Sequence, residues 1–313
     1  MQRRHFTKNL LTMAMIPTLA TFTPNYAKAY SSDYSRSTAE PFKLKYAPHF
    51  GMFENSAGKD PIDQLKFMAD NGFLAMEDNG MMGRTPELQT KIGDTLSKLG
   101  MSMGVFVVAF DNWPVSTSLT SGNEEWRNKF IKACKEAVEV AKRVNAKWMT
   151  VVPGNYERKL PMGLQTAHVI DSLRRGAEIF EPHGLTMVLE PLSDTPDLFL
   201  RHSDQTYMIC KAVNSPSCKL LFDMYHMQRN EGNIIKNIDL CWSEIAYLQI
   251  GDNPGRNEPT SGEMNYLNIF KHLDKKFKEL GKDMILGMEH GNAQPGKAGE
   301  MALIEAYRAS DKF

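Results

Sequence analysis

Acidic side chains end three of the last four apolar runs in this sequence, and an amide lies in the fourth. The acids are Glu190, Asp223 and Glu289, and the amide is Gln249. If these runs are parallel strands, their carboxyl ends meet at one edge and the four side chains converge. Carboxylates held together would raise one another's pKa values, and a divalent cation between them removes that conflict.

The donor set favours one class of metal. All four side chains offer oxygen and none offers sulfur or imidazole, which favours Mg2+ or Mn2+ over Zn2+. We therefore predict a metal site made by Glu190, Asp223, Gln249 and Glu289. Alternatively, each acid only caps its strand or pairs with a nearby Lys or Arg. Three acids on four successive strands favour the metal site.

Four further residues near strand ends are candidates for substrate binding. His226 follows Asp223 by three positions, and Arg256 lies in the loop after the run that contains Gln249. A neutral histidine can donate to a substrate hydroxyl, and a guanidinium can hold a carboxylate or paired oxygens. His49 and Glu77 end the first two apolar runs and are predicted at the same edge. A single histidine beside a strand can equally be structural.

Eight short apolar runs predict the strands that position these residues. They are 44–50, 73–77, 103–110, 148–152, 185–190, 220–223, 246–250 and 285–289. Segments of helical period lie between most of them, and 123–144 has the clearest pattern. The others are 61–71, 86–99, 164–180, 204–213, 266–280 and 298–307, with a further helix start expected at 262–266.

Alternating strands and helices of this number and length predict a single-domain (β/α)8 TIM barrel at 44–313. The segment after the sixth run has the weakest helical pattern. A dinucleotide-binding fold is disfavoured because no GxGxxG follows the first run.

The first 43 residues have a different character. Arg3 and Arg4 precede an apolar stretch from Leu10 to Phe22, and Ala27-Lys28-Ala29 follows. This pattern predicts a twin-arginine signal peptide at 1–29 and a polar linker at 30–43, and therefore a periplasmic or otherwise exported protein. The alternative is a membrane anchor. The stretch is shorter than a membrane-spanning helix requires, so we expect no stable span after cleavage.

Composition limits the partners. The 313 residues include 37 basic and 37 acidic side chains, for a formal net charge of zero. A nucleic-acid binder would show a basic excess, so we expect a small-molecule substrate instead. The four cysteines form no CxxC pair, which favours free, mostly buried thiols.

Two loops resemble one enzyme family closely. The segments 251–266 (GDNPGRNEPTSGEMNY) and 222–228 (FDMYHMQ) resemble hydroxypyruvate isomerases, and Leu189-Glu190-Pro191 and Gly287-Met288-Glu289 fit that family's two catalytic glutamates. The resemblance extends from about residue 44 onward. It places the chain among xylose isomerase-like barrels, which also include ketose epimerases, inosose dehydratases and endonuclease IV. The histidine-rich zinc site of endonuclease IV is missing from this sequence.

The resemblance implies a metal at Glu190, Asp223, Gln249 and Glu289, with Glu190 and Glu289 as the catalytic pair, most simply Glu190 as base and Glu289 as acid. The implied reaction interconverts a small hydroxy-ketone and hydroxy-aldehyde through an enediolate, as between hydroxypyruvate and tartronate semialdehyde. His226 would stabilise a substrate oxygen, and Arg256 would hold the far end of the substrate. The same side chains would serve an exported sugar epimerase or an inosose-type dehydratase. A sugar-binding barrel without catalysis is a further alternative.

Overall fold

Parallel strands form the centre of the fold in the computed structural model, which describes residues 39–111 and 117–313. Seven strands form one sheet in the order β1-β9-β8-β7-β6-β5-β4, and β2 pairs with β3. Their bounds are β1 Lys45–Ala47, β2 Ala75–Met76, β3 Ser102–Met103, β4 Phe106–Val107, β5 Trp148–Val151, β6 Thr186–Leu189, β7 Cys218–Asp223, β8 Ile245–Gln249 and β9 Ile285–Gly287.

Backbone hydrogen bonds connect the two sheets. The amide of Glu77 donates to the carbonyl of Pro48, and the amide of Asp78 donates to that of Val105. These contacts join the β2–β3 pair to the segments around β1 and β4. The resulting arrangement is TIM-barrel-like, in agreement with the predicted fold class.

The predicted strand 103–110 is two short strands. β3 pairs with β2, whereas β4 pairs with β5 on the other side. The segment changes partner part of the way along its length, so the two parts belong to different ladders. An apolar run in the sequence does not show which neighbour each part will pair with.

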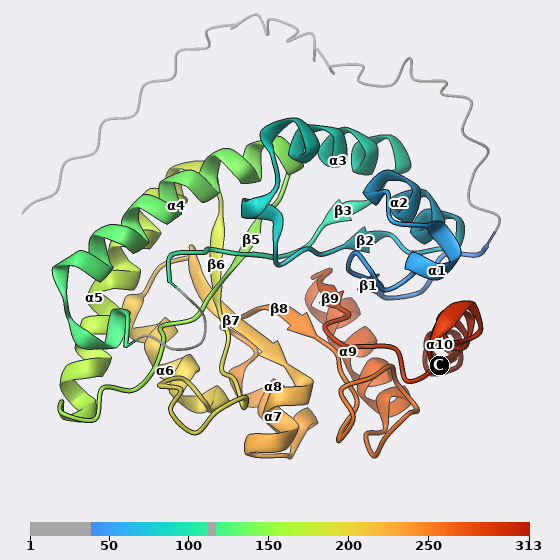
Figure 1. The fold of residues 1–313 in the computed structure, drawn as a ribbon. Coiled ribbons are helices and arrows are strands. Elements are labelled where there is room, and N and C mark those ends of the chain that lie inside the picture. Colours follow the sequence, from blue (N-terminus) through green and yellow to red (C-terminus); the bar gives the residue numbers. More distant parts are fainter. Residues whose placement is uncertain (1–38, 112–116) are drawn as a thin grey trace, which may run out of the picture. The chain divides into compact units, whose positions relative to one another are not determined.

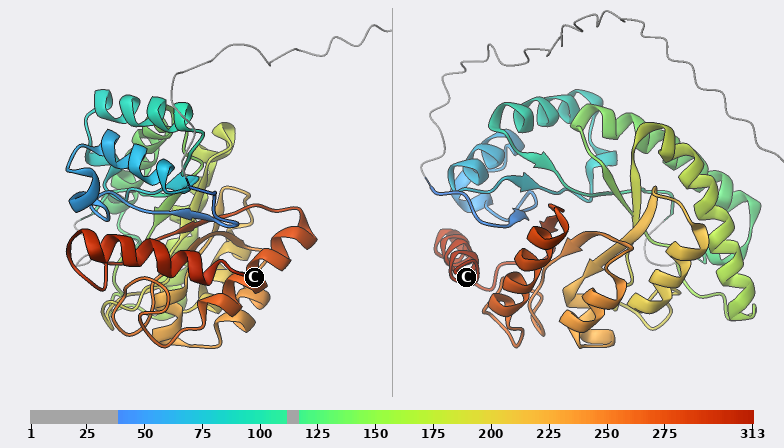
Figure 2. Two further views of the ribbon diagram at one scale, coloured as in Figure 1. Left: turned by 90° about the vertical axis from the view of Figure 1, so that its right-hand side faces the viewer. Right: turned by 180° about the vertical axis from the view of Figure 1, so that it is seen from behind.

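Helices cover the outside of the strands, as Figures 1 and 2 show. Two of them, α3 and α9, have the bounds that the sequence predicts. In α3 the Thr85 side chain accepts from the amide of Leu88, and Gly100 ends the helix in the left-handed conformation. The α-helices are α1 Glu54–Ala57, α2 Pro61–Asp70, α3 Pro86–Leu99, α4 Glu124–Val144, α5 Met162–Phe180, α6 Ser203–Val213, α7 Met224–Asn230, α8 Ile234–Cys241, α9 Tyr266–Leu280 and α10 Gly296–Ser310.

The segments around β7 and β8 differ from prediction. Two short helices, α7 and α8, follow β7 where the pattern was weakest. The helix start expected at 262–266 is wrong for its first four residues. The amides of Gly262 and Met264 donate to the carboxylate of Asp252, so they are held in the loop, and α9 begins at Tyr266.

A small hydrophobic cluster marks the inner layer of the strands. Six of its seven buried residues lie in six different strands, and Val105 lies between β3 and β4. The seven residues are Ala47, Ala75, Val105, Val188, Leu221, Tyr247 and Ile285. A much larger cluster packs strands against helices. Tyr247 brings a hydroxyl into the inner layer, where a buried polar atom needs a partner.

All four cysteines are free and buried, as predicted. Across 39–111 and 117–313, no helix has both the length and the apolar character needed to cross a membrane. The predicted signal peptide, and the linker before residue 39, lie outside the described residues.

Candidate active site

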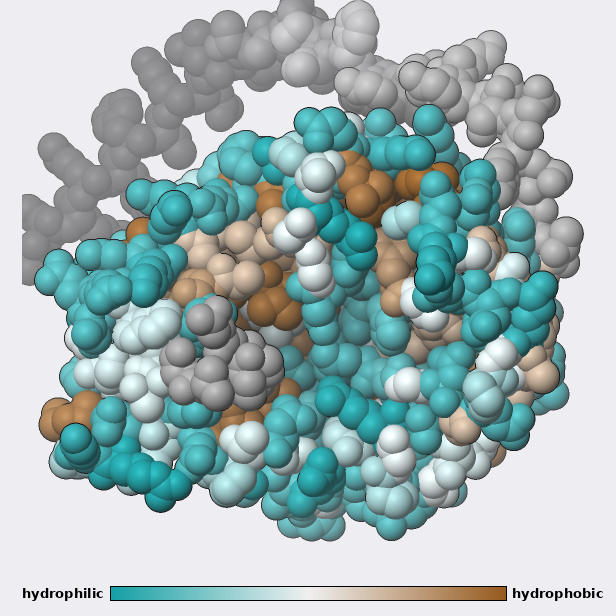
Figure 3. Space-filling model, in the orientation of Figure 1, coloured by the Kyte–Doolittle hydropathy of each residue, from teal (hydrophilic) through white to brown (hydrophobic). Residues whose placement is uncertain are grey.

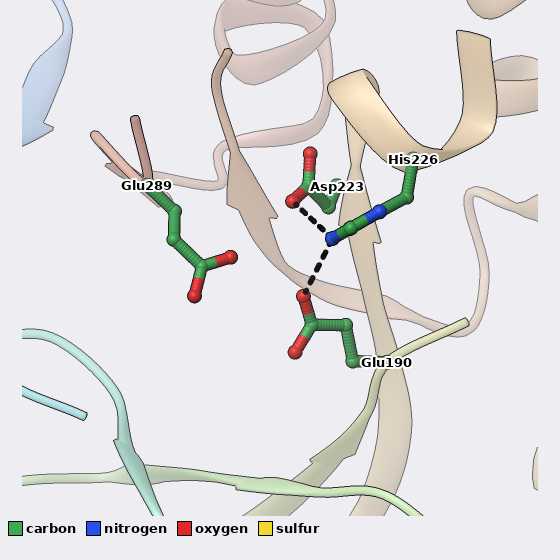
Figure 4. A group of neighbouring side chains, drawn as sticks. All are labelled: Glu190, Asp223, His226 and Glu289. Atoms are coloured by element: carbon green, nitrogen blue, oxygen red, sulfur yellow. Dashed lines mark ion pairs between the residues drawn. The ribbon is translucent and has the colours of Figure 1, made fainter. Parts of the chain in front are cut away.

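Glu190, Asp223, His226 and Glu289 form one tight cluster. Each offers a ligand atom, and these atoms all lie within 4.8 Å of one another. Figure 4 shows His226 between Asp223 and Glu190, with Glu289 reaching toward them from the opposite side. The distances from His226 Nε2 are 3.5 Å to Asp223 Oδ2 and 4.0 Å to Glu190 Oε1. The structure therefore brings together both predicted catalytic glutamates.

Neighbouring parallel strands deliver these side chains. Glu190 follows β6, Asp223 ends β7, and Glu289 follows β9 by two residues. Gln249 ends β8 and lies opposite Asp223 in the strand register. Carboxyl ends of barrel strands form the functional face of this fold, which is why ligands separated by almost 100 residues converge.

Burial and mutual repulsion dominate the electrostatics of the carboxyl groups. Burial raises the pKa of Glu190 well above its usual value, and the charges of Glu289 and Asp223 raise it further. Burial also raises the pKa values of Asp223 and Glu289, while the Arg256 guanidinium acts in the opposite direction on both. Without a further cation besides Arg256, the three carboxyl groups therefore stay protonated to a higher pH than free carboxyl groups do.

Arg256 partly balances this negative charge. Its Nη2 donates to Glu289 Oε2 at 2.8 Å and to Asp223 Oδ2 at 3.4 Å, and its Nε donates to the Glu289 carbonyl. The guanidinium lies over the Tyr225 ring, with 4.9 Å from Cζ to the ring centroid. Burial opposes its charge, but Asp223 and Glu289 raise the pKa of Arg256 and keep it protonated.

His226 is fully buried at the start of α7. Its Nδ1 accepts from the backbone amide of Ser193 at 3.2 Å and lies 2.8 Å from the Ser193 hydroxyl. Burial, with help from Arg256, lowers the pKa of His226 to about 4, so the ring is neutral at ordinary pH. Its Nε2 also lies 3.1 Å from Arg256 Nη2.

Two observations test whether the predicted ligands fit a metal. Glu190 Oε1 and Gln249 Oε1 are buried and have no hydrogen-bond partner within the described part of the chain. Buried polar atoms are normally satisfied, so each of these two oxygens is available to a ligand. Three buried carboxyl groups and an amide oxygen suit a hard divalent cation. The residues therefore fit the predicted metal.

A cavity of about 500 Å3 opens onto the cluster. Apolar residues form one part of its wall, among them Val107, Val108, Phe110 and Leu192, and polar residues form the other. The polar ones include Asn79, Asp194, Glu190, His226, Arg256 and Glu289. Figure 3 shows a hollow on this side of the molecule, with hydrophobic residues gathered along one side of it. Its volume is within the range of small-molecule sites.

His49 and Glu77 are placed differently from the other predicted site residues. Neither is among the described residues that line the cavity. The two ring nitrogens of His49 lie 2.9 Å from the Phe50 carbonyl and 3.1 Å from that of His290. Glu77 is buried, and its carboxylate accepts from Tyr247 and Gln249. Their predicted contact with substrate stays a prediction.

Sequence reasoning missed Asn79 and Ser193. Asn79 Nδ2 donates to Glu289 Oε1 at 2.7 Å, opposite the oxygen that Arg256 holds. Both residues lie in loops just after strands, where no periodic pattern marks them. Their position after predicted strand ends was the one signal that could have found them.

Comparisons with known proteins indicate the family and the reaction class. Residues 65–308 match the family model described as xylose isomerase-like TIM barrel. The 2-oxo-tetronate isomerase of Cupriavidus necator is 26% identical over 248 residues, which cover 79% of this chain and 92% of that protein. The hydroxypyruvate isomerase of Escherichia coli is 30% identical over 159 residues, covering 49% of this chain and 59% of that protein. The prediction of an isomerase is thus confirmed by the names of these relatives.

Solved structures support the fold. The 3-keto-D-glucoside 4-epimerase of E. coli superimposes with a TM-score of 0.70 at 17% identity, covering 85% of this chain and 100% of that one. At this identity the likeness concerns the fold alone. The match over most of the barrel confirms the resemblance predicted from the two loops, and the chain belongs to the xylose isomerase-like TIM-barrel family.

Proposed function

We propose that this protein is a metal-dependent isomerase that moves a proton between neighbouring carbons of a small hydroxy-carbonyl compound, as hydroxypyruvate isomerase does. One observation carries the proposal. Two glutamates, Glu190 and Glu289, approach the same point from different strands, beside unpartnered oxygen atoms and at the wall of a cavity. The names of the relatives support the same reaction class.

The metal would be held by Glu190, Asp223, Gln249 and Glu289, and the oxygen donors favour Mg2+ or Mn2+. When bound, the ion supplies positive charge that stabilises the developing enediolate. It also offsets the repulsion that raises the pKa values of the carboxyl groups, which allows Glu190 to be ionised.

The side chains divide the proton transfers among them. Glu190 removes a proton from the hydroxyl-bearing carbon, and Glu289 delivers one to the neighbouring carbonyl carbon. The hydroxyl proton moves to the former carbonyl oxygen, so a hydroxy-ketone becomes a hydroxy-aldehyde with no net change in composition. Asn79 and Arg256 hold the two oxygens of Glu289 and fix its orientation.

His226 and Arg256 would bind an oxygen of the substrate. The Ser193 amide makes Nδ1 of His226 an acceptor, so the ring proton of the neutral histidine is on Nε2. The approach of Arg256 Nη2 to this nitrogen then brings two donors together at 3.1 Å. A substrate oxygen that faces both nitrogens from the cavity would accept from both, which gives the pair a role in binding charge that develops during the reaction.

A second candidate is an epimerase or dehydratase that acts on a larger sugar. The cavity of about 500 Å3 is large for a three-carbon acid, and five of its wall residues are apolar valine, phenylalanine or leucine side chains. Epimerisation uses the same proton abstraction, with return to the same carbon from the opposite face. We further propose export through the twin-arginine signal at 1–29, which would place the enzyme among extracytoplasmic sugars.

Product analysis by NMR distinguishes these functions. The chain from Tyr30 onward, loaded with Mn2+ or Mg2+, would be incubated with hydroxypyruvate, a set of ketohexoses and an inosose. A new aldehyde signal from hydroxypyruvate supports the isomerase. Conversion of a ketohexose alone moves the assignment to an epimerase, and water loss from inosose moves it to a dehydratase. Substrate binding without conversion of any compound would support a sugar-binding protein and contradict the proposal.

A further inference from the structure

We infer that Glu77 is a positioning residue that turns the side-chain amide of Gln249 so that its oxygen, rather than its nitrogen, is available to the metal. This inference rests on the proposed metal site. It gives Glu77 a role that does not require contact with substrate.

The contacts around Gln249 carry the inference. Gln249 Nε2 donates to Glu77 Oε1 at 3.3 Å, whereas Gln249 Oε1 is buried without a hydrogen-bond partner among the described residues. An amide has one donor end and one acceptor end, so fixing the nitrogen determines where the oxygen lies. An ionised carboxylate accepts only, and it therefore selects the nitrogen. Burial and the Glu289 charge raise the pKa of Glu77, whereas the bonds from Tyr247 and Gln249 lower it and favour the ionised form.

Tyr247 fixes the carboxylate in turn. Its hydroxyl donates to Glu77 Oε2 at 2.9 Å and lies 3.4 Å from the amide nitrogen of Val105, which donates to it. Both oxygens of Glu77 thus accept from side chains of β8. Glu77, Tyr247 and Gln249 are all buried, at 1%, 0% and 0% exposure, so water does not compete for these bonds.

Two glycines leave room for this group. A Cβ at Gly287 would lie 1.9 Å from Glu77 Oε2, and a Cβ at Gly104 would lie 2.3 Å from the Tyr247 hydroxyl. Any larger residue at either position would collide with the pair. The two glycines therefore leave space for the Glu77 carboxylate and for the Tyr247 hydroxyl that donates to it.

Replacing Glu77 by glutamine tests the idea through its hydrogen-bond pattern. A carboxylate accepts from both Tyr247 and Gln249, but an amide can accept at one end only and must donate at the other. With Tyr247 donating to Gln at position 77, the new amide nitrogen faces Gln249, which must turn its oxygen away from the metal. The double variant Glu77→Gln with Gln249→Glu reverses the bond, so that position 249 again offers an oxygen.

The measurement is Mn2+ affinity, by calorimetry and by EPR of the free ion, on the full barrel from Tyr30. We expect Glu77→Gln to weaken binding 10- to 100-fold, on the order found when metal-orienting residues are removed. The double variant should bind Mn2+ with an affinity within about 3-fold of wild type, because position 249 again offers an oxygen. Tyr247→Phe is the comparison variant: it removes a donor to Glu77 but keeps the Glu77–Gln249 bond, so it should weaken Mn2+ binding less than Glu77→Gln does.

The outcomes distinguish failure of the proposed metal site from failure of the positioning role of Glu77. If wild type binds no Mn2+ or Mg2+, the proposed function fails before the variants are compared. If wild type binds and folded Glu77→Gln binds equally well, only the positioning role is overturned. If Glu77→Gln does not fold, the double variant provides the test. Wild-type affinity for Mn2+ in the double variant supports the reversed hydrogen bond between positions 77 and 249. Weak binding by a folded double variant contradicts it.

Discussion

The backbone amide of Ser193 donates to Nδ1 of His226, with 3.2 Å between the two nitrogens. This bond favours the tautomer with a lone pair on Nδ1, because a backbone N–H is always a donor. The carboxylates near Nε2 favour the same tautomer, whereas Arg256 Nη2, which also donates and lies 3.1 Å from Nε2, opposes it. Nε2 of the neutral ring therefore carries the proton and faces Asp223, Glu190 and the cavity. A protonated nitrogen cannot bind a metal, so His226 is better suited to donate to substrate than to act as a ligand.

The first prediction concerns this tautomer. In 15N NMR of the metal-free protein, the His226 ring should show an unprotonated Nδ1 and a protonated Nε2. Because burial lowers its pKa to about 4, the signals should stay unchanged from about pH 8 to about pH 5.5. The resonance is assigned by its loss in His226→Gln. Observation of the Nδ1-protonated form would contradict the proposed role and make metal ligation by Nε2 possible.

Asn79 should affect turnover more than substrate binding. Its amide donates to Glu289 Oε1, so Asn79→Ala leaves that oxygen free to rotate while Arg256 still holds the other. We expect kcat to fall about 10-fold with KM changed less than about 3-fold, as for loss of an interaction that matters mainly in the transition state. Steady-state kinetics on the substrate found by NMR measure this. A change in KM alone would show that Asn79 binds substrate directly.

Gly287 should tolerate no side chain. A Cβ there would lie 1.9 Å from the buried Glu77 carboxylate, so Gly287→Ala should lower the free energy of unfolding by about 1–3 kcal/mol. Gly163, in α5, is the matched control because a Cβ there meets nothing within 4 Å. Alanine at 163 should be neutral or stabilising by up to about 1 kcal/mol. Urea unfolding compares the two, and equal stability would mean that Glu77 has room to move.

Metal binding should release protons. The pKa values of Glu190, Asp223 and Glu289 are all raised in the metal-free cluster, so protons compete with the metal more strongly as pH falls. Affinity for Mn2+ should therefore decrease from about pH 7.5 to about pH 5.5, with release of about one proton per ion near the lower end. Calorimetry in buffers of different ionisation enthalpy counts the protons. Binding heats that do not depend on the buffer would contradict the raised pKa values.

The sequence predicted the acidic residues of the site better than the loop residues that contact them. Glu190, Asp223 and Glu289 were found because an acid at the end of an apolar strand is a local signal, and the barrel topology places successive strand ends together. Gln249 was predicted by the same reasoning, and it lies opposite Asp223 in the strand register. Asn79 and Ser193 were missed because each depends on a loop conformation that no short-range pattern encodes.

The errors in the predicted fold have similar physical causes. Helices α3 and α9 were predicted to the residue because their apolar spacing and C-terminal glycines are local. The split between β3 and β4 depends on which neighbour each part pairs with. The loop at 262–265, where a helix start was also expected, depends on Asp252, which accepts from Gly262 and Met264. These are tertiary contacts, and a single sequence does not reveal them.

The most direct test of the central claim is deuterium uptake from heavy water, followed by 1H NMR on the metal-loaded protein. With hydroxypyruvate or a ketose as substrate, wild type should exchange the proton next to the carbonyl, and removal of the metal with a chelator should abolish exchange. Glu190→Gln should lose exchange while still binding Mn2+, because it lacks the base but keeps an oxygen ligand. Full exchange in Glu190→Gln, or exchange that persists without metal, would contradict the account.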